Sequence, residues 1–404
     1  MYITRALEKE VLDCSRQFPV IMVTGPRQVG KTTMLQKLAD DGRKYISLDD
    51  PLARAAAKSD PALFLQRYEP PVMIDEIQYA PEILPYIKMY VDTHKHKGDF
   101  WLTGSQMFHM MKNVTESLAG RVAIIQMFGL SGSEIANVEN EPFVCDHQKM
   151  MERQKKRAPQ SLRKIYERIH TGSMPVAYAG EFGWERFYSA YVNTYLQRDI
   201  KDLTQVGDEM SFLNFMTACA ARTSQMVNYA ELAKDVGISA PTAKQWLSIL
   251  VSSGVITLIQ PYFNNVLKRA IKSPNMYFMD TGLCAYLTRW DSAKTLEISA
   301  MSGAFFETYV VSEILKSYYN AGKRPPTYYY RDTDGKEIDL LLEQNNTLYP
   351  IEIKKSANPK KNAIRNFAVL EKAGKEIGEG CVVCLYPDVF PLDKSNWLIP
   401  VWLI

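Results

Sequence analysis

Residues 20–33 read VIMVTGPRQVGKTT. The apolar start is typical of a buried strand, the middle is a loop bounded by Gly25 and Gly30, and Lys31 begins a segment with a helical pattern. The spacing GxxxxGK followed by Ser or Thr, between a strand and a helix, is that of a phosphate-binding loop. Backbone N–H groups and the positive end of the helix dipole face the phosphates there. The stretch predicts a nucleotide site, because a chance glycine-rich turn would not require the flanking strand and helix.

The residues of this loop have separate expected roles toward ATP. Lys31 is the candidate catalytic cation that reaches the β- and γ-phosphates, and the Thr32 hydroxyl is a candidate ligand of Mg²⁺. The residues expected to bind the nucleotide are Gly25, Pro26, Arg27, Gln28, Val29, Gly30, Lys31, Thr32 and Thr33.

Two carboxylates follow a second apolar strand, which the sequence predicts over residues 71–74. Ligands of open α/β sheets bind at the carboxyl ends of the strands, where Asp75 and Glu76 would lie. We expect Asp75 to hold Mg²⁺, directly or through water, and Glu76 to be the catalytic base or to orient the attacking water. An acidic turn after a strand is a weak signal alone, but the preceding phosphate loop strengthens it.

Two further positions are candidate catalytic residues. A third strand over residues 100–102 leads into Thr103 to Gln106, where Ser105 is expected to sense the γ-phosphate unless the segment is a simple polar turn. Arg121 stands just before the apolar run 122–125. It can stabilise transition-state charge in its own chain or across a subunit interface, or be a surface arginine at a strand edge.

The alternation of strands and helices over residues 18–130 predicts a parallel α/β sheet. With GPRQVGKT (25–32), IDEIQ (74–78), LTGSQ (102–106) and LAGR (118–121), the chain resembles the AAA-type ATP-binding proteins of bacteria and archaea. The resemblance implies that the first two motifs are the two Walker motifs and that the third is a sensor. It also implies a phosphate-facing or interfacial arginine in the fourth.

The middle of the chain has two patterns. A run of basic residues over 149–168 is either a solvated helix face or a contact to a phosphate backbone. Residues 229–250 read as helix, glycine turn and helix, followed by two predicted strands, which is a winged helix-turn-helix layout. On its second helix Thr242, Lys244 and Gln245 can face a DNA major groove. Such units also serve as protein-interaction modules, and both alternatives stay open.

The final third contains a second candidate site. A helix over 303–315 carries Glu307, and Asp339 lies on a predicted strand that a turn at residues 345–346 connects to the next strand. There Glu352 and Lys354 are two residues apart and point to one face. Asp339 and Glu352 can bind Mg²⁺, and Lys354 can activate water or stabilise charge at a phosphodiester. The alternative is an exposed strand with an ordinary Glu–Lys pair.

This order of acidic and basic residues resembles the restriction-endonuclease-like nucleases with the PD-(D/E)xK motif. Glu307 matches the helical carboxylate of the Holliday-junction-resolvase-like branch, which implies a catalytic role for it. Three further stretches are PYFNNVLKR (261–269), KSPNMYFMDTGL (272–283) and IEIKKS (351–356). With them, nearly the whole chain looks like a large prokaryotic family that pairs an AAA-type ATPase with a C-terminal domain of unknown function. The resemblance implies ATP binding and hydrolysis and a restriction-endonuclease-like C-terminal domain. With the patterns above, we predict an α/β protein of four parts: an AAA-type P-loop ATPase domain (1–145), a helical linker or lid (146–205), a winged helix-turn-helix domain (206–282) and a restriction-endonuclease-like domain (283–404).

Composition limits the remaining classes. The formal net charge of +3 is too small to indicate nucleic acid by itself. We find no run of eighteen apolar residues and no leader pattern, which predicts a cytoplasmic protein without a membrane partner. Beside ATP, the possible partners are DNA and further copies of this chain. The leading hypothesis is a Mg²⁺-dependent ATPase coupled to a DNA-directed nuclease-like module; in the alternative, the C-terminal domain is an inactive regulatory or protein-binding module.

Overall fold

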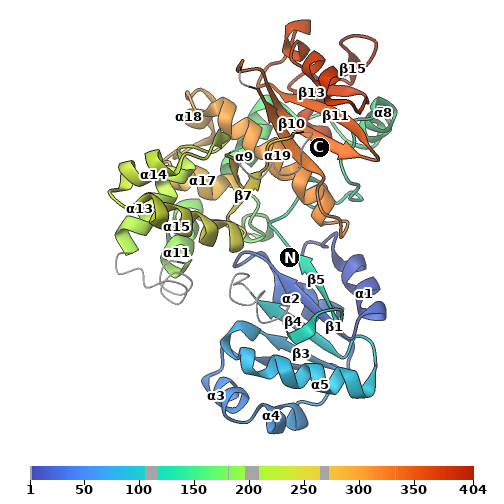
Figure 1. Cartoon of the computed structure of the whole chain (residues 1–404), viewed down its shortest axis with the longest axis vertical. Helices are drawn as coiled ribbons and strands as arrows, with labels where there is room; N and C mark the ends of the chain where they lie inside the picture. The colour runs from blue at the N-terminus through green and yellow to red at the C-terminus, as the bar shows by residue number, and fades with distance from the viewer. Residues whose placement is uncertain (1, 105–116, 181, 196–208, 264–272, 333) are drawn as a thin grey trace.

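The computed structural model of the chain describes residues 2–104, 117–180, 182–195, 209–263, 273–332 and 334–404. Figure 1 shows an N-terminal region at the bottom, a middle region at the left and a C-terminal region at the top right. The expectation for Ser105 lies outside the described residues.

The N-terminal region is built on a parallel sheet with the strand order β2–β3–β4–β1–β5. The three inner strands β1, β3 and β4 are short, largely apolar and buried along their whole length, which is typical of parallel strands covered on both faces. Their bounds are β1 (Val20–Thr24), β2 (Lys44–Ser47), β3 (Val72–Asp75), β4 (Phe100–Gly104) and β5 (Val122–Gln126). The predicted parallel α/β sheet is confirmed.

Helices cover both faces of this sheet. Ile21 and Val23 pack in one core with residues of α1 and α2, whereas Val20 and Met22 pack in another with residues of α3, α4 and α5. The bounds are α1 (Glu8–Gln17), α2 (Lys31–Leu38), α3 (Pro51–Ser59), α4 (Pro61–Arg67) and α5 (Leu84–His94), with short 3₁₀ turns η1 (Ile77–Tyr79) and η2 (Pro81–Ile83). The covered faces leave the carboxyl edge of the strands as the place for a site.

The segment after β5 connects the regions. Its helices are α7 (Gly132–Ile135), α8 (His147–Lys156), α9 (Leu162–Thr171), α10 (Val176–Ala179) and α11 (Trp184–Tyr195). In Figure 1 α8 lies beside the C-terminal sheet, away from α9 and α11. Arg157 Nη1 donates to the carbonyls of Leu403 and Ile404 at 3.0 Å each. Within the described part of the predicted linker 146–205, α8 thus packs against the C-terminal sheet, whereas α9 packs against the helices of residues 281–287 and 293–297.

The middle region combines helices with an antiparallel sheet of the order β6–β8–β7. Asn228 caps α14, Gly237 ends it at φ 76°, and Ser239 caps α15. The elements are α13 (Glu209–Ala220), β6 (Gln225–Met226), α14 (Tyr229–Val236), α15 (Ala240–Ser252), β7 (Ile256–Ile259) and β8 (Asn275–Phe278). On α15 the side chains of Lys244 and Gln245 are exposed, and Thr242 is half-buried.

The C-terminal region is a mixed sheet beside the long helix α19 (Ser302–Tyr319), which is reached through α17 (Thr281–Leu287) and α18 (Ala293–Glu297). The strand order is β14–β15–β13–β11–β10–β9, and β12 pairs with β11. The strands are β9 (Thr327–Arg331), β10 (Glu337–Gln344), β11 (Thr347–Ile353), β12 (Glu376–Ile377), β13 (Gly380–Cys384), β14 (Phe390–Pro391) and β15 (Asn396–Pro400). Short 3₁₀ helices are η4 (Lys361–Ile364), η5 (Phe367–Ala373) and η6 (Val401–Leu403).

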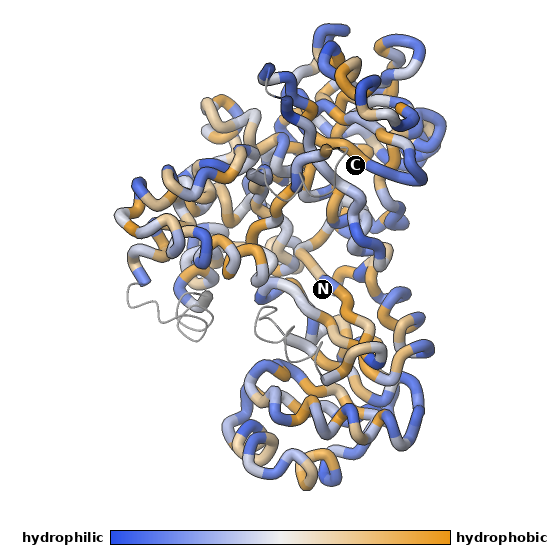
Figure 2. The backbone as a smooth tube through the Cα atoms, viewed as in Figure 1, coloured by the Kyte–Doolittle hydropathy of each residue, from blue (hydrophilic) through white to orange (hydrophobic). Residues whose placement is uncertain are grey.

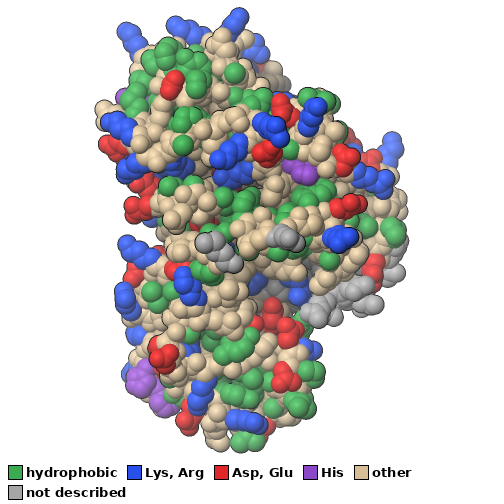
Figure 3. Space-filling model, turned by 180° about the vertical axis from the view of Figure 1, so that it is seen from behind, with side chains coloured by type: hydrophobic (Ala, Val, Ile, Leu, Met, Phe, Trp, Pro, Cys, Tyr) green, Lys and Arg blue, Asp and Glu red, His purple; other side chains and the backbone are tan. Residues whose placement is uncertain are grey.

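The middle and C-terminal regions are joined through their backbones. Tyr262 N donates to Tyr329 O at 2.7 Å, and Tyr329 N donates to Gln260 O at 3.1 Å. Figure 2 shows the hydrophobic residues concentrated along strands and inner helix faces, with hydrophilic residues at the periphery. The face in Figure 3 mixes Lys and Arg with Asp and Glu, in agreement with the small net charge. No helix among the described residues is long and apolar enough to cross a membrane.

Candidate nucleotide site and acidic cluster

The loop between β1 and α2 has the backbone conformation that its glycines permit. Gly25 has φ 144° and Gly30 has φ 93°, both outside the range that L side chains readily adopt. A Cβ atom on Gly25 would also lie 1.9 Å from the carbonyl oxygen of Met127. Lys31 Nζ donates to the carbonyls of Gly25 (2.9 Å) and Pro26 (2.7 Å), so its ammonium group lies against the loop. The predicted loop residues therefore form a turn around a cation.

The two candidate magnesium ligands of this site are in direct contact. Thr32 Oγ1 donates a 2.8 Å hydrogen bond to Asp75 Oδ1, and Thr103 Oγ1 donates to the same oxygen. The Tyr45 hydroxyl donates to Asp75 Oδ2 at 3.2 Å. Burial and the charge of Asp75 raise the pKa of Tyr45 to about 12, so its phenol keeps its proton. Three elements thus converge on one carboxylate at the carboxyl edge of the sheet.

Glu76 is held beside Asp75 by its backbone. It adopts φ 57°, an unusual left-handed conformation for a glutamate, and its N–H donates to Thr103 Oγ1 at 3.1 Å. Its carboxylate accepts a hydrogen bond from Gln78 Nε2. The predicted pair of carboxylates is therefore positioned by Thr103, which the sequence interpretation passed over in favour of Ser105. Thr103 belongs to the motif LTGSQ, so the sequence contained a signal for it. No sequence pattern indicated Tyr45.

Thr103→Val is expected to lower ATP turnover roughly tenfold, because hydrogen bonds to charged groups contribute about 1.5–3 kcal/mol and this hydroxyl fixes two groups. Valine has nearly the same shape but can neither donate to Asp75 nor accept from Glu76 N. Steady-state ATPase assays of the variant and of wild type would measure the change. An unchanged kcat would contradict the positioning role of Thr103.

Arg121 lies at the opposite edge of the sheet from the phosphate loop. Its carbonyl accepts from Val20 N at the start of β1, and its guanidinium pairs with Asp92 at 2.5 and 3.0 Å. A strand rises about 3.3 Å per residue, so the length of β1 separates Arg121 from the loop. This geometry argues against a contact between Arg121 and ATP phosphates in its own subunit. A role across a subunit interface stays a prediction.

A cavity of about 330 Å³ adjoins the loop and the first turn of α2. Its lining is mainly apolar. It comes from the N-terminal segment, the phosphate loop and the start of α2, from Leu130 ahead of α7, and from the two ends of α10. The lining residues are Tyr2, Ile3, Arg5, Val29, Gly30, Thr33, Leu130, Pro175 and Ala179. Small-molecule sites commonly combine such an apolar cavity with a few polar groups.

The acidic residues predicted in the final third cluster around Lys354. Lys354 Nζ lies 2.6 Å from Glu352 Oε1 and 3.5 Å from Asp339 Oδ2. Asp339 Oδ2 also accepts from Ile353 N at 2.8 Å. Glu307, on α19, accepts from the Tyr277 hydroxyl at 2.8 Å and interacts electrostatically with Asp339 and Lys354. The structure therefore brings all four predicted residues into one cluster, with Tyr277 of β8 as an additional member.

Burial raises the pKa values of the carboxyl groups in this cluster. Burial and the charge of Asp339 together raise the pKa of Glu307 and of Glu352, and the pKa of Glu352 reaches about 7. Burial also raises the pKa of Asp339 against the opposing effect of Lys354. Burial lowers the pKa of Lys354, but the two carboxylates outweigh this effect and the net shift is upward. Glu352 Oε2 is buried and has no hydrogen-bond partner among the described residues.

Glu352→Gln is expected to stabilise the protein increasingly as the pH rises. Since folding raises this pKa from 4.5 to about 7, the stabilisation by protonated Glu352 is complete below pH 4.5 and is lost as the pH passes 7. The variant avoids this loss and should gain about 3 kcal/mol over wild type near pH 8, and less than about 1 kcal/mol near pH 5. Urea unfolding at both pH values would measure it, with exposed Glu371→Gln as the control. A difference independent of pH would contradict it.

Residues 17–136 match the family model described as AAA domain. Together with the parallel sheet and the loop geometry, this match defines the N-terminal region as an AAA-type, ATP-binding P-loop ATPase domain. Residues 162–294 and 302–404 match two further models, each described as a domain of unknown function (DUF8612 and DUF4143).

Relatives of this chain include uncharacterized proteins of two mycobacteria, Rv2008c of Mycobacterium tuberculosis and Mb2031c of Mycobacterium bovis. Each is 27% identical over 385 residues, which cover 95% of this chain and 80% of the relative. Among solved structures, the chain is similar to the Walker-type ATPase of Pyrococcus abyssi, with 14% identity, coverage of 71% of this chain and 96% of that chain, and a TM-score of 0.43.

Proposed function

We propose that this protein hydrolyses ATP at the loop between β1 and α2 and that nucleotide state controls a nuclease-like site at Asp339, Glu352 and Lys354. The observation that carries the ATPase assignment is the hydrogen bond between Thr32 and Asp75. It supports a pair of hard oxygen donors, from the phosphate loop and from the neighbouring acidic motif, at one point of the sheet edge.

The residues of the ATP site divide the work of hydrolysis. Lys31 and the backbone N–H groups of the loop bind the phosphates, and Glu76 accepts a proton from the attacking water. The Thr32 hydroxyl and the Asp75 carboxylate suit Mg²⁺, because a hard cation prefers oxygen ligands. Bound there, Mg²⁺ would neutralise charge on the β- and γ-phosphates. Thr103 and Tyr45 keep Asp75 in place.

The apolar cavity beside the loop is the proposed site of the nucleobase. It adjoins Gly30 and Thr33, so a nucleotide whose phosphates lie in the loop can extend its base toward Ile3 and Ala179. A largely apolar lining favours a flat aromatic base over a second charged group.

Contacts from the phosphate loop to the other regions support coupling. A Cβ atom on Gly254 would lie 3.0 Å from Pro26 side-chain atoms, so the turn after α15 abuts the loop. Gly132 N donates to Glu313 Oε2 at 2.6 Å, and Glu313 lies on α19, the helix that carries Glu307. A shift of the loop or of the segment after β5 would therefore reach both the helix-turn-helix unit and the acidic cluster.

The acidic cluster has the composition of a metal-dependent phosphodiesterase site. Asp339 and Glu352 suit Mg²⁺ or Mn²⁺, and Glu352 Oε2 is a buried oxygen with no hydrogen-bond partner in the part of the chain that the structure describes. Lys354 would stabilise charge on the scissile phosphate. Exposed Lys244 and Gln245 on α15 support DNA as the substrate, because a second helix of this kind can enter a major groove.

Incubation of the full chain with linear and branched DNA, Mg²⁺ or Mn²⁺, and with or without ATP tests this proposal. We expect ATP turnover and metal-dependent cleavage whose rate changes when ATP is present. Absence of cleavage on every substrate, with ATP turnover intact, would refute the nuclease assignment. Absence of ATP turnover in all conditions would refute the ATPase assignment.

A second candidate function keeps the ATPase and makes the C-terminal region a binding module. One observation favours it: within the described part of the chain, no group of three or more His, Cys, Asp or Glu side chains is arranged to hold a metal ion. This candidate predicts DNA or protein binding that responds to ATP, without cleavage. In either case Arg121 would act, if at all, in a neighbouring copy of a homo-oligomer.

A further inference from the structure

Arg5 connects the phosphate loop to the segment after β5, although it lies outside every nucleotide-binding motif of the sequence. Its Nη1 donates to the carbonyl of Val29 at 2.6 Å, its Nη2 donates to the carbonyl of Phe128 at 2.8 Å, and its Nε pairs with Glu134 Oε1 at 2.8 Å. The side chain is buried, with 3% exposed. All three nitrogen atoms of the guanidinium group therefore have a partner.

The contact with Val29 acts on the part of the loop that faces phosphate. Val29 lies between Gln28, at φ 60°, and Gly30, at φ 93°. Both neighbours thus have positive φ angles, and the backbone turns sharply on each side of the Val29 carbonyl. The next N–H groups, of Gly30 and Lys31, begin α2 and are among those expected to bind phosphate. Holding the Val29 carbonyl fixes the direction of these N–H groups.

Arg5 is itself fixed by Glu134. Glu134 Oε1 also accepts from Ala6 N at 2.9 Å, and Oε2 accepts from Ser131 N at 2.7 Å. The hydroxyl of Ser131 accepts from Asn320 Nδ2 at 3.2 Å, at the end of α19. The guanidinium thus cannot move without breaking contacts to the segment that reaches the C-terminal region.

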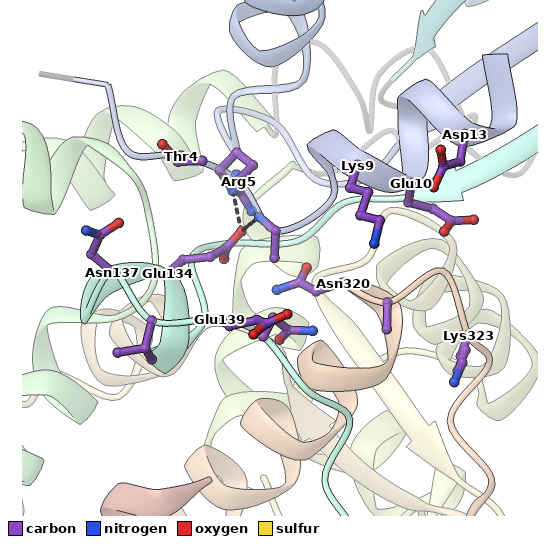
Figure 4. A pocket seen from close by; sticks show the side chains of 14 residues that line it. Thr4, Arg5, Lys9, Glu10, Asp13, Glu134, Asn137, Glu139, Asn320 and Lys323 are labelled. Atoms are coloured by element: carbon purple, nitrogen blue, oxygen red, sulfur yellow. Dashed lines mark hydrogen bonds and ion pairs between the residues drawn. The ribbon is translucent and has the colours of Figure 1, made fainter. Parts of the chain in front are cut away.

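Arg5 also forms a wall between two cavities. One is the apolar cavity proposed for the nucleobase. The other, of about 620 Å³, is polar and separates α1 from residues 134–140 and 320–323. Figure 4 shows the Arg5–Glu134 interaction at this second cavity, with Lys9, Glu10 and Asp13 along α1 and Lys323 on the opposite side. The ion pair therefore spans the junction where the ATPase domain meets the rest of the chain.

We propose that Arg5 is a positioning residue of the ATP site, which sets the phosphate loop in its binding conformation through the carbonyl of Val29. Its fixed planar fork is required, because a lysine can keep the charge beside Glu134 but cannot reach Val29, Phe128 and Glu134 together. The inference rests on the proposed nucleotide site.

Arg5→Lys is the test variant, because it leaves Glu134 paired and removes the fork. Arg16→Lys is the control, since Arg16 lies on α1, the helix that follows Arg5, and its side chain is 75% exposed. Binding of a fluorescent ATP analogue is measured at a temperature at which circular dichroism shows all variants folded. We expect the Kd of Arg5→Lys to rise roughly tenfold and that of Arg16→Lys to stay within about twofold of wild type.

Wild type and Lys31→Ala are the two reference proteins for binding of the ATP analogue. If both bind the analogue equally, the proposed nucleotide site fails, whatever Arg5 does. If wild type binds, Lys31→Ala does not and Arg5→Lys matches wild type, only the role of Arg5 fails. A purely structural role would let lysine restore binding and would appear as a lower Tm alone.

Discussion

Replacing Lys31 with alanine is expected to lower ATP turnover by about 10²–10³-fold, since removal of one preorganised charge-stabilising donor has an effect of this size. Lys31 Nζ is held 2.9 and 2.7 Å from the carbonyls of Gly25 and Pro26, so the positive charge lies against the loop. Alanine removes the charge and leaves the loop carbonyls without this donor. Binding of ATP should weaken together with turnover.

Steady-state turnover and equilibrium binding of ATP would measure both effects of Lys31→Ala. Lys58→Ala is the matched control, because Lys58 is an exposed lysine on α3 of the same domain. The control should retain wild-type turnover. Turnover by Lys31→Ala close to that of wild type would place ATP hydrolysis elsewhere in the chain.

The parts of the fold that follow from local patterns could be predicted from the sequence. The apolar runs around 20–24 and 72–75 became the strands whose ends carry the nucleotide site. The turn between β10 and β11 also followed from residue type. Asn345 and Asn346 have φ 48° and 66°, a left-handed conformation that asparagine tolerates better than most residues. Once that turn was placed, the alternation of side chains put Glu352 and Lys354 on one face.

Contacts between distant segments could not be predicted in this way. The basic run 149–168 gave a choice between a solvated face and a phosphate contact, whereas Arg153 is buried and donates to the carbonyl of Leu403. Arg168 is near Glu313 in a buried group. Their partners lie far along the chain, so charge patterning alone contains no information on them. The same reason hid Arg5, whose motif-free position gives no signal of its contact with the loop.

Arg121 shows a different limit. Its place at the end of the LAGR segment agreed with the resemblance, but the register of β5 with β1 sets the edge of the sheet at which it lies. A residue before a parallel strand points to the amino edge, and ligands of such sheets bind at the carboxyl edge. The direction of the strand therefore outweighs the match of the motif for any role within one subunit.

Asp339→Asn is expected to abolish metal-dependent DNA cleavage by the proposed nuclease-like site, with a loss of at least about 10²-fold. Asp339 is the carboxylate next to both Lys354 and the backbone of Ile353, and Glu352 is left as the remaining strand carboxylate. Asparagine can still accept from Ile353 N, so the local fold should persist. ATP turnover should be unchanged, because Lys31, Asp75 and Glu76 belong to the N-terminal region and Asp339 belongs to the C-terminal sheet.

The same variant has an electrostatic consequence that does not depend on cleavage. The charge of Asp339 raises the pKa values of Glu307 and Glu352, so its removal should lower both, and Glu352 should ionise at a lower pH than in wild type. NMR titration of labelled glutamate side chains would measure this shift, with exposed Asp334→Asn as the control. If the pKa of Glu352 falls in Asp339→Asn but the wild type cleaves no DNA, the side chains of the cluster interact electrostatically without a nuclease reaction. That result would favour a binding role for the C-terminal region. Cleavage that survives in Asp339→Asn would place the reaction at other residues.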